Sequence, residues 1–202
     1  MSDVLAAYRI TPTNAALLVV DMQRGFLDVG AAMEVASGRD AVRPISSLAA
    51  EFRRVAAPVV YTRFVWSPTV PTLVGELRPQ HKPPTCCCME GDPSVAIVDG
   101  LAPRAGDLVV DKHGYDAFHE TRLDYALRSL GRTHLVVTGV MTEVCVLATV
   151  TSAMHREYRV SVVSDAVATK WDDVQRATLA LVSRCYGRVV ASEDALAETS
   201  LG

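Results

Sequence analysis

The sequence predicts an α/β fold, a three-layer sandwich around a six-stranded, mostly parallel sheet. Short apolar runs rich in β-branched residues alternate with segments of helical periodicity, as parallel strands and their crossover helices do. The runs are continuously apolar, which is typical of strands that helices cover on both faces. With 202 residues, half of them apolar, and no linker or internal repeat, we expect a single domain over residues 1–202 with its core at about 14–190.

The elements follow from these patterns in order along the chain. The expected strands are the apolar runs at residues 16–21, 59–64, 107–112, 134–139, 159–163 and 188–190. The expected helices cover residues 40–57, 119–130, 142–155 and 172–186. Pro58 ends the first of these helices, and Gly131 and Gly187 follow the second and the fourth. Residues 66–106 hold most of the prolines and show no strong periodicity, and so long a loop is usually functional.

Composition and charge exclude several classes of function. The formal net charge is −3 with both signs interspersed, so no basic stripe indicates nucleic acid or an anionic membrane. The N-terminus lacks a secretory signal pattern, and no apolar run approaches the ~20 residues that span a bilayer. The five cysteines are odd in number and without framework spacing, so we expect no structural disulfides. We therefore expect a soluble, cytoplasmic protein with a small-molecule substrate.

Three reactive side chains stand at the ends of predicted strands. Asp21 ends the first strand, Lys112 ends the third, and Cys145 lies shortly after the fourth. Thr142 is expected to be the N-cap of the following helix, which places Cys145 in the first turn, where the helix dipole favours thiolate. Open parallel sheets bind ligands at the carboxyl ends of their strands, so the three groups are expected to meet there. Each residue taken alone also has an interpretation without catalysis. Asp21 caps a turn after its strand, Lys112 is a solvated strand end, and Cys145 is an inert core cysteine.

The sequence resembles the isochorismatase-like cysteine hydrolases. The matching residues are 19–23, 109–112, 115–118 with Thr121 and Leu123, and 139–146. The resemblance implies a Rossmann-like six-stranded sheet. It also implies a catalytic triad of Asp21, Lys112 and Cys145, in which Asp21 acts as general base and Cys145 forms a thioester. It also implies an oxyanion hole made by the backbone N–H groups of Met141 and Cys145, and a cis peptide bond between Val140 and Met141. It implies a homo-oligomer as well, which we expect to be a homodimer or homotetramer.

The residues expected to line the pocket are less specific. They are Gln23, Phe26, Trp66, Tyr115, Phe118 and Thr142. Packing under the following helix explains Tyr115 and Phe118 equally well, and Trp66 is either a lid aromatic or a surface anchor. Arg63, Arg78 and Lys82 either recognise a substrate carboxylate or are solvated surface charges. The segment from Trp66 to Gly91 is expected to close the pocket, with or without help from a neighbouring subunit.

No metal or cofactor is expected. The nicotinamidase branch of the family carries an Asp-x-His metal motif after its second strand, and residues 61–68 of this chain contain neither Asp nor His. The five histidines are scattered without paired ligand spacing, although His113 and His119 flank the sheet edge near Lys112. Adjacent residues seldom direct all their sulfurs at one ion, so for Cys86, Cys87 and Cys88 we favour a buried or half-buried pocket-lining segment.

Three hypotheses for the function remain. The first is hydrolysis of a C–N bond in a small amide, ureido or carbamoyl compound through an acyl-enzyme. The second is hydrolysis of a vinyl ether of isochorismate type, in which Asp21 acts as an acid and Cys145 is dispensable. The third is a binding module that has kept the fold without the chemistry.

Overall fold

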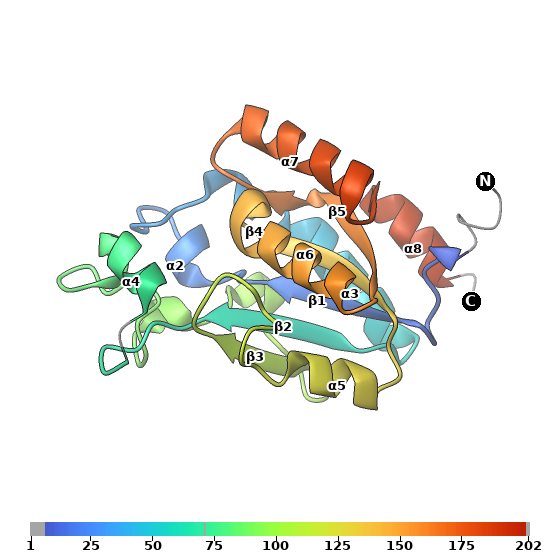
Figure 1. The fold of residues 1–202 in the computed structure, drawn as a ribbon, viewed down its shortest axis with the longest axis horizontal. Coiled ribbons are helices and arrows are strands. Elements are labelled where there is room, and N and C mark those ends of the chain that lie inside the picture. Colours follow the sequence, from blue (N-terminus) through green and yellow to red (C-terminus); the bar gives the residue numbers. More distant parts are fainter. Residues whose placement is uncertain (1–6, 71, 201–202) are drawn as a thin grey trace.

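The six apolar runs form one sheet in the computed structural model, which describes residues 7–70 and 72–200 (Figure 1). Residues 1–6, 71 and 201–202 belong to the predicted domain but lie outside the described residues. The strands are β1 Ala15–Val20, β2 Val59–Phe64, β3 Leu108–Lys112, β4 His134–Val140, β5 Arg159–Ala168 and β6 Arg188–Val190. Their order is β3-β2-β1-β4-β5-β6 and every pairing is parallel, so the sheet is wholly rather than mostly parallel.

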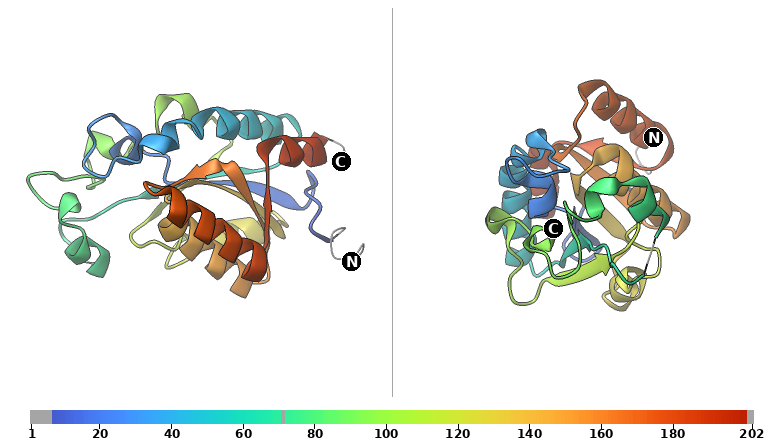
Figure 2. Two further views of the ribbon diagram at one scale, coloured as in Figure 1. Left: turned by 90° about the horizontal axis from the view of Figure 1, so that it is seen from above. Right: turned by 90° about the vertical axis from the view of Figure 1, so that its left-hand side faces the viewer.

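Helices cover both faces of the sheet, because successive side chains of a strand point to opposite sides. Leu17 and Val19 pack in one apolar cluster with α3 (Val42–Arg54) and α8 (Ser192–Ser200). Leu18 and Val20 pack in a second cluster with α5 (Leu123–Ser129), α6 (Leu147–His155) and α7 (Asp172–Cys185). The left view of Figure 2 shows α3 and α8 on one side of the sheet and α6 and α7 on the other. This is the predicted three-layer sandwich.

Some element boundaries differ from those expected. The helix expected over 119–130 begins only at Leu123, because residues before it form turns in which Asp116 Oδ1 accepts from the Phe118 N–H and Thr121 Oγ1 donates to the Ala117 carbonyl. β5 continues to Ala168, five residues past the expected end at 163, alongside a register shift in β4 between Val137 and Gly139. The structure also contains α2 (Arg24–Leu27) and α8, which were not expected.

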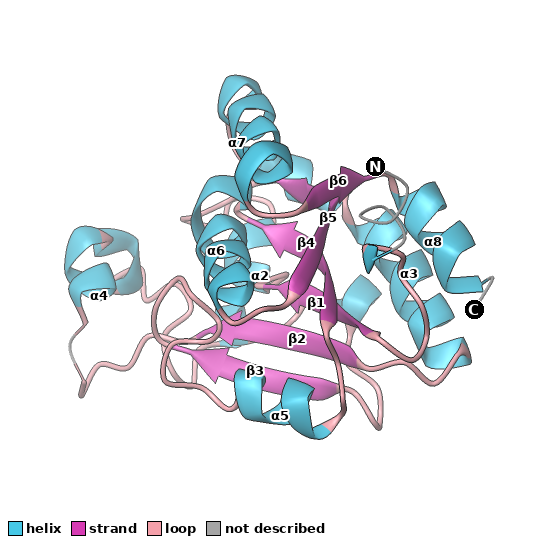
Figure 3. Cartoon of the chain, turned by 45° about the vertical axis from the view of Figure 1, so that its right-hand side comes forward, coloured by secondary structure: helices cyan, strands magenta, loops and turns pink. Residues whose placement is uncertain are grey.

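The segment between β2 and β3 is mostly irregular, as predicted. It contains the short helix α4 (Leu73–Leu77), which stands away from the sheet in Figures 1 and 3. It also contains short 3₁₀ helices at Pro79–His81, Pro93–Val95 and Asp99–Leu101, and a further one, Ala36–Arg39, lies between β1 and α3. After α4 the chain returns to the end of β2, since the Trp66 N–H donates to the Cys88 carbonyl and the Glu90 N–H donates to the Trp66 carbonyl. These two bonds join the residues on either side of α4.

The strand order reverses between β1 and β4, and this is where an open α/β sheet forms its ligand-binding crevice. The two strands approach closely at Gly139, which has φ +109, a value that side chains rarely allow. A Cβ atom at Gly139 would lie 2.0 Å from the Val20 carbonyl oxygen. Glycine is thus required at the point where β4 passes the end of β1.

Candidate active site

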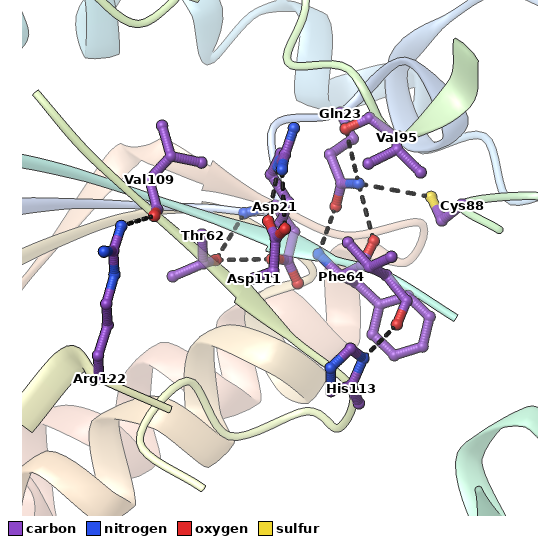
Figure 4. A network of polar contacts seen from close by, with 12 residues as sticks. Asp21, Gln23, Thr62, Phe64, Cys88, Val95, Val109, Asp111, His113 and Arg122 are labelled. Carbon is purple, nitrogen blue, oxygen red and sulfur yellow. Dashed lines mark hydrogen bonds and ion pairs between the residues drawn. The ribbon is translucent and has the colours of Figure 1, made fainter. Parts of the chain in front are cut away.

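Asp21 is the first residue after β1, and it is fully buried. Its backbone has φ 51, in the left-handed region that non-glycine residues seldom adopt. Thr62 on the neighbouring strand β2 holds it, because Thr62 Oγ1 donates to Asp21 Oδ1 at 2.6 Å and accepts from the Asp21 N–H at 3.2 Å (Figure 4). These two bonds fix the backbone and one carboxylate oxygen of Asp21.

Lys112, the last residue of β3, brings the opposite charge to the same place. Its ammonium is fully buried and lies 2.8 Å from Asp21 Oδ2, so the long side chain spans the width of β2. Nζ also donates to the Gly114 carbonyl at 2.9 Å and lies 5.4 Å from the centre of the Phe64 ring. Burial lowers the pKa of Lys112, but the negative charge of Asp21, together with Cys145, outweighs it and raises that pKa overall. The ammonium therefore stays protonated.

The contact between Lys112 and Asp21 is a buried ion pair, with the ammonium 2.8 Å from Oδ2. Oδ1 of the same carboxylate accepts from Thr62, so Oδ2 is the oxygen that faces the ammonium. An ionised carboxylate is an acceptor only, so it can take a proton from a neighbouring group.

Cys145 completes the group on the other side of the crevice. It is 7 % exposed and lies in a π-helical turn, Thr142–Val146, that leads into α6. The carboxylate of Asp21 and the ammonium of Lys112 are both close enough to affect its pKa. The thiol therefore faces one group that can take its proton and one that can stabilise its anion.

Two expectations about Cys145 are wrong. Burial raises the pKa of Cys145 to about 12, against the lowering effect of Lys112, so the thiol is neutral rather than ionised in the free protein. The expected preference for thiolate is therefore not found, and burial is the largest cause of the shift in pKa. Thr142 is not the N-cap either: the turn begins at Thr142 itself after Met141, and the buried Thr142 hydroxyl has no partner among the described residues.

A cavity of about 150 Å³ opens onto the thiol. The peptide bond between Val140 and Met141, which form part of its wall, is cis, as the resemblance implies. The cavity is lined by Phe26, Ala32, Met33, Phe64, Arg78, Gln80, His81, Tyr115, Val140, Met141, Glu143, Val144, Cys145, Lys170 and Trp171. Its size suits a molecule of few heavy atoms, since ligand pockets commonly measure ~300 Å³ or more.

Of the predicted pocket residues, Phe26 and Tyr115 line this cavity, and Arg78 Nε donates to the Tyr115 hydroxyl at 3.3 Å. Of the three cations considered as carboxylate ligands, Arg78 alone lines the cavity. Arg63 pairs with Asp111 at 2.7 Å instead. The histidines that flank the sheet edge, His113 and His119, do not line the cavity.

Four other predicted pocket residues lie elsewhere. Gln23 is fully buried and bridges three backbone groups, since its side chain donates to the Phe64 and Val95 carbonyls and accepts from the Phe64 N–H (Figure 4). Trp66 packs its indole against Gly75, where a Cβ would lie 2.1 Å from Nε1. Phe118 packs on Tyr158 in the core, and Thr142 is buried. The positions of Gln23 and Phe118 are set by partners distant in the sequence, which the local sequence does not reveal.

The structure adds cavity residues that the sequence did not single out. His81 is buried, stacks 4.7 Å from the centre of the Phe64 ring, and its Nδ1 donates to the Cys87 carbonyl at 2.7 Å. Burial lowers the pKa of His81, so its ring is neutral near pH 7. Glu143 and the pair Lys170–Trp171 also line the cavity. Glu143 stands two positions before Cys145, the one signal that could have marked it.

The three consecutive cysteines pack behind the cavity rather than in it. Cys87 and Cys88 are buried, and their sulfurs lie 3.9 Å apart against Gly25, where a Cβ would be 2.6 Å from Cys88 Sγ. Cys87 and Cys88 are buried as expected, but the three cysteines do not line the cavity, so the expectation of a pocket-lining segment is wrong for this cavity. Over residues 7–70 and 72–200, no group of three or more His, Cys, Asp or Glu side chains is arranged to hold a metal ion. None of the described helices is long and apolar enough to cross a membrane.

A buried thiol beside a carboxylate and an ammonium, at the crevice of a parallel sheet, is the arrangement of a hydrolytic enzyme that uses a nucleophile. Comparison with protein families gives the more specific assignment. The isochorismatase domain matches residues 15–194, and the chain therefore belongs to the isochorismatase family of hydrolases.

Individual relatives agree with this assignment. The ureidoacrylate amidohydrolase RutB of Methylobacterium radiotolerans is 32% identical over 96% of this chain and 81% of its own. A cysteine hydrolase from Pseudomonas syringae pv. phaseolicola superimposes with a TM-score of 0.87 at 31% identity, covering 95% of this chain and 94% of its own. The N-carbamoylsarcosine amidase from Thermoplasma acidophilum superimposes with a TM-score of 0.77 at 32% identity, covering 89% of this chain and 97% of its own.

Proposed function

We propose that the protein hydrolyses a C–N bond of a small amide, ureido or carbamoyl compound, with Cys145 as the nucleophile. The observation that carries this proposal is the buried carboxylate of Asp21, paired with the Lys112 ammonium, next to a neutral thiol that lines a small cavity. Acyl transfer needs a nucleophile that can be deprotonated at the moment of attack, and this grouping supplies one.

The first half of the reaction forms a thioester. Asp21 takes the thiol proton while the sulfur of Cys145 attacks the carbonyl carbon, and the ammonium of Lys112 stabilises the developing negative charge on sulfur. The backbone N–H groups of Met141 and Cys145 are the proposed donors to the oxyanion, and both residues line the cavity. The C–N bond then breaks, and Asp21 gives the proton to the leaving nitrogen.

The second half releases the acid. Asp21, again ionised, takes a proton from water as the oxygen attacks the thioester. The C–S bond breaks, the thiolate regains the proton from Asp21, and the acid leaves. The cycle returns the thiol and the carboxylate to their initial states, so it consumes only water.

Relatives support the substrate class. A ureidoacrylate amidohydrolase and an N-carbamoylsarcosine amidase, each 32% identical to this chain, carry names that specify amide-type bonds in small carbamoyl or ureido compounds. The small cavity agrees with substrates of that size.

The test is ammonia release from a panel of small amides, ureido acids and N-carbamoyl amino acids, with nicotinamide included. Wild type and Cys145→Ala are assayed in parallel, with no added metal and with a chelator. We expect release by the wild type and none by the variant, because no other side chain of the group can form a thioester. A variant as active as the wild type would contradict the proposal. No ammonia release by either protein would also contradict it, and would favour vinyl ether hydrolysis, in which Asp21 acts as the acid.

A further inference from the structure

Glu143 is an acidic residue that lines the cavity and takes no part in the proposed reaction. It stands two positions before Cys145 in the same π-helical turn and lines the same cavity. Both of its carboxylate oxygens are shielded from solvent, and neither has a hydrogen-bond partner among the described residues. A shielded carboxylate without donors is unfavourable, since the water it lost is not replaced. The free protein therefore presents an unsatisfied acceptor next to its nucleophile.

Two cations line the same cavity. Arg78 and Lys170 are both exposed, and Arg78 Nε is held at 3.3 Å from the Tyr115 hydroxyl. Arg78, Tyr115, Glu143 and Val144 also line an open groove that runs along α6. These four residues therefore lie where the enclosed cavity meets the open groove. Because Arg78 is exposed there, a charged substituent of a bound molecule can reach its guanidinium.

This arrangement matches one kind of molecule. A ureido or N-carbamoyl acid carries N–H donors beside its reactive carbonyl and a carboxylate a few bonds away. The donors suit the unpartnered oxygens of Glu143, and the carboxylate suits the guanidinium of Arg78, which favours planar anions. A simple uncharged amide has no group for Arg78 and fewer N–H donors for Glu143.

Resting on the proposed function, we propose that Glu143 determines specificity by accepting hydrogen bonds from the substrate's ureido or carbamoyl N–H groups. Arg78 binds the substrate carboxylate where the cavity meets the groove. The preferred substrates are then ureido and N-carbamoyl acids rather than simple amides. Glu143 contributes to binding and orientation and takes no part in proton transfer.

The test compares kcat/KM for N-carbamoyl amino acids with kcat/KM for the matching simple amides in wild type, Glu143→Gln and Arg78→Met. Glutamine keeps the shape of glutamate but presents N–H donors to the substrate's donors. We expect Glu143→Gln to lower kcat/KM for carbamoyl acids by about tenfold or more, mainly through KM, with little change for simple amides. Arg78→Met is expected to have the same effect only on substrates that carry a carboxylate.

Glu90→Gln is the matched control, because Glu90 is exposed and does not line the cavity. An unchanged ratio of the two kcat/KM values in Glu143→Gln would overturn the inference. So would a change in the sedimentation mass of Glu143→Gln without a change in selectivity, because the partner of Glu143 would then be a second copy of the chain.

Binding measurements separate this inference from the proposed function. Calorimetry of carbamoyl acids with Cys145→Ala, with and without Glu143→Gln, tests recognition when no reaction can occur. If the wild type hydrolyses nothing but Glu143→Gln weakens this binding by about tenfold, the proposed function fails and the inference stands. If no carbamoyl acid binds to Cys145→Ala, the inference fails.

Discussion

Asp21 and Lys112 bury two full charges in contact, at 0 % exposure for each side chain. Such a pair is sustained only when each charge balances the other and the remaining polar atoms find partners. Thr62 and the Gly114 carbonyl supply those partners for one oxygen and for the ammonium. The other carboxylate oxygen, Oδ2, lies 2.8 Å from the ammonium.

Replacing Asp21 with asparagine should affect both activity and stability. The variant keeps the shape but loses the base, so we expect kcat to fall by about 10³-fold. It also leaves the Lys112 ammonium buried without a counter-charge, which should lower the free energy of unfolding by ~3–5 kcal/mol in urea titrations. Asp111→Asn is the control, because the exposed pair of Asp111 with Arg63 contributes less than about 1 kcal/mol. Equal losses for both variants would contradict this account of the buried pair.

At the scale of the elements, the close passage of β4 against β1 brings Cys145 within reach of Asp21. The cis peptide bond between Val140 and Met141 and the π-helical turn follow directly after that passage. The approach depends on Gly139, because a Cβ there would lie 2.0 Å from the Val20 carbonyl oxygen.

Gly139→Ala should therefore destabilise the protein strongly. Both the backbone conformation at φ +109 and the contact with β1 exclude a side chain, so the strands must separate. We expect a loss of more than about 3 kcal/mol in the free energy of unfolding, or failure to fold, measured by thermal and urea denaturation. Gly114→Ala serves as the comparison, because a Cβ at Gly114 would meet nothing within 4 Å. A stable Gly139→Ala protein with an unchanged midpoint would refute the argument.

At the scale of the whole molecule, acid stability should depend on a histidine far from the cavity. His134 begins β4, is fully buried, and its Nε2 lies 2.8 Å from Ser161 Oγ. Burial, and then the nearby positive charge of Arg188, lower the pKa of His134 from 6.5 to about 4. Between these two values the unfolded chain binds a proton that the folded chain does not. Stability is therefore expected to fall as the pH drops through that window.

The expected loss between pH 6.5 and 4 is at most about 3 kcal/mol. It is measured as the free energy of unfolding in urea at several pH values. His134→Gln should flatten this dependence, although it lowers stability near pH 7. His155→Gln, which changes an exposed histidine, should leave the slope as it is in the wild type. A slope that His134→Gln does not alter would assign the acid sensitivity to other groups.

Much of the fold was predictable from the sequence alone because it depends on local pattern. The β-branched runs define the six strands, and the helical spacing of residues such as Ile45, Leu48 and Phe52 defines the covering helix. Side chains that end such strands must meet at one edge of a parallel sheet, so Asp21, Lys112 and Cys145 could be grouped without a structure. The resemblance to a known family agreed with that grouping.

What only the tertiary structure decided is set by contacts between distant segments. Gln23 and Phe26 looked equivalent in the sequence, yet Gln23 joins the backbones at Phe64 and Val95 whereas Phe26 lines the cavity. The neutral state of the Cys145 thiol depends on how far the surrounding packing removes it from water. Glu143 and Arg78 line one cavity only because the long segment after β2 returns to the end of that strand. Local periodicity specifies strands and helices, but a side chain's partners, burial and charge balance depend on packing across the whole chain.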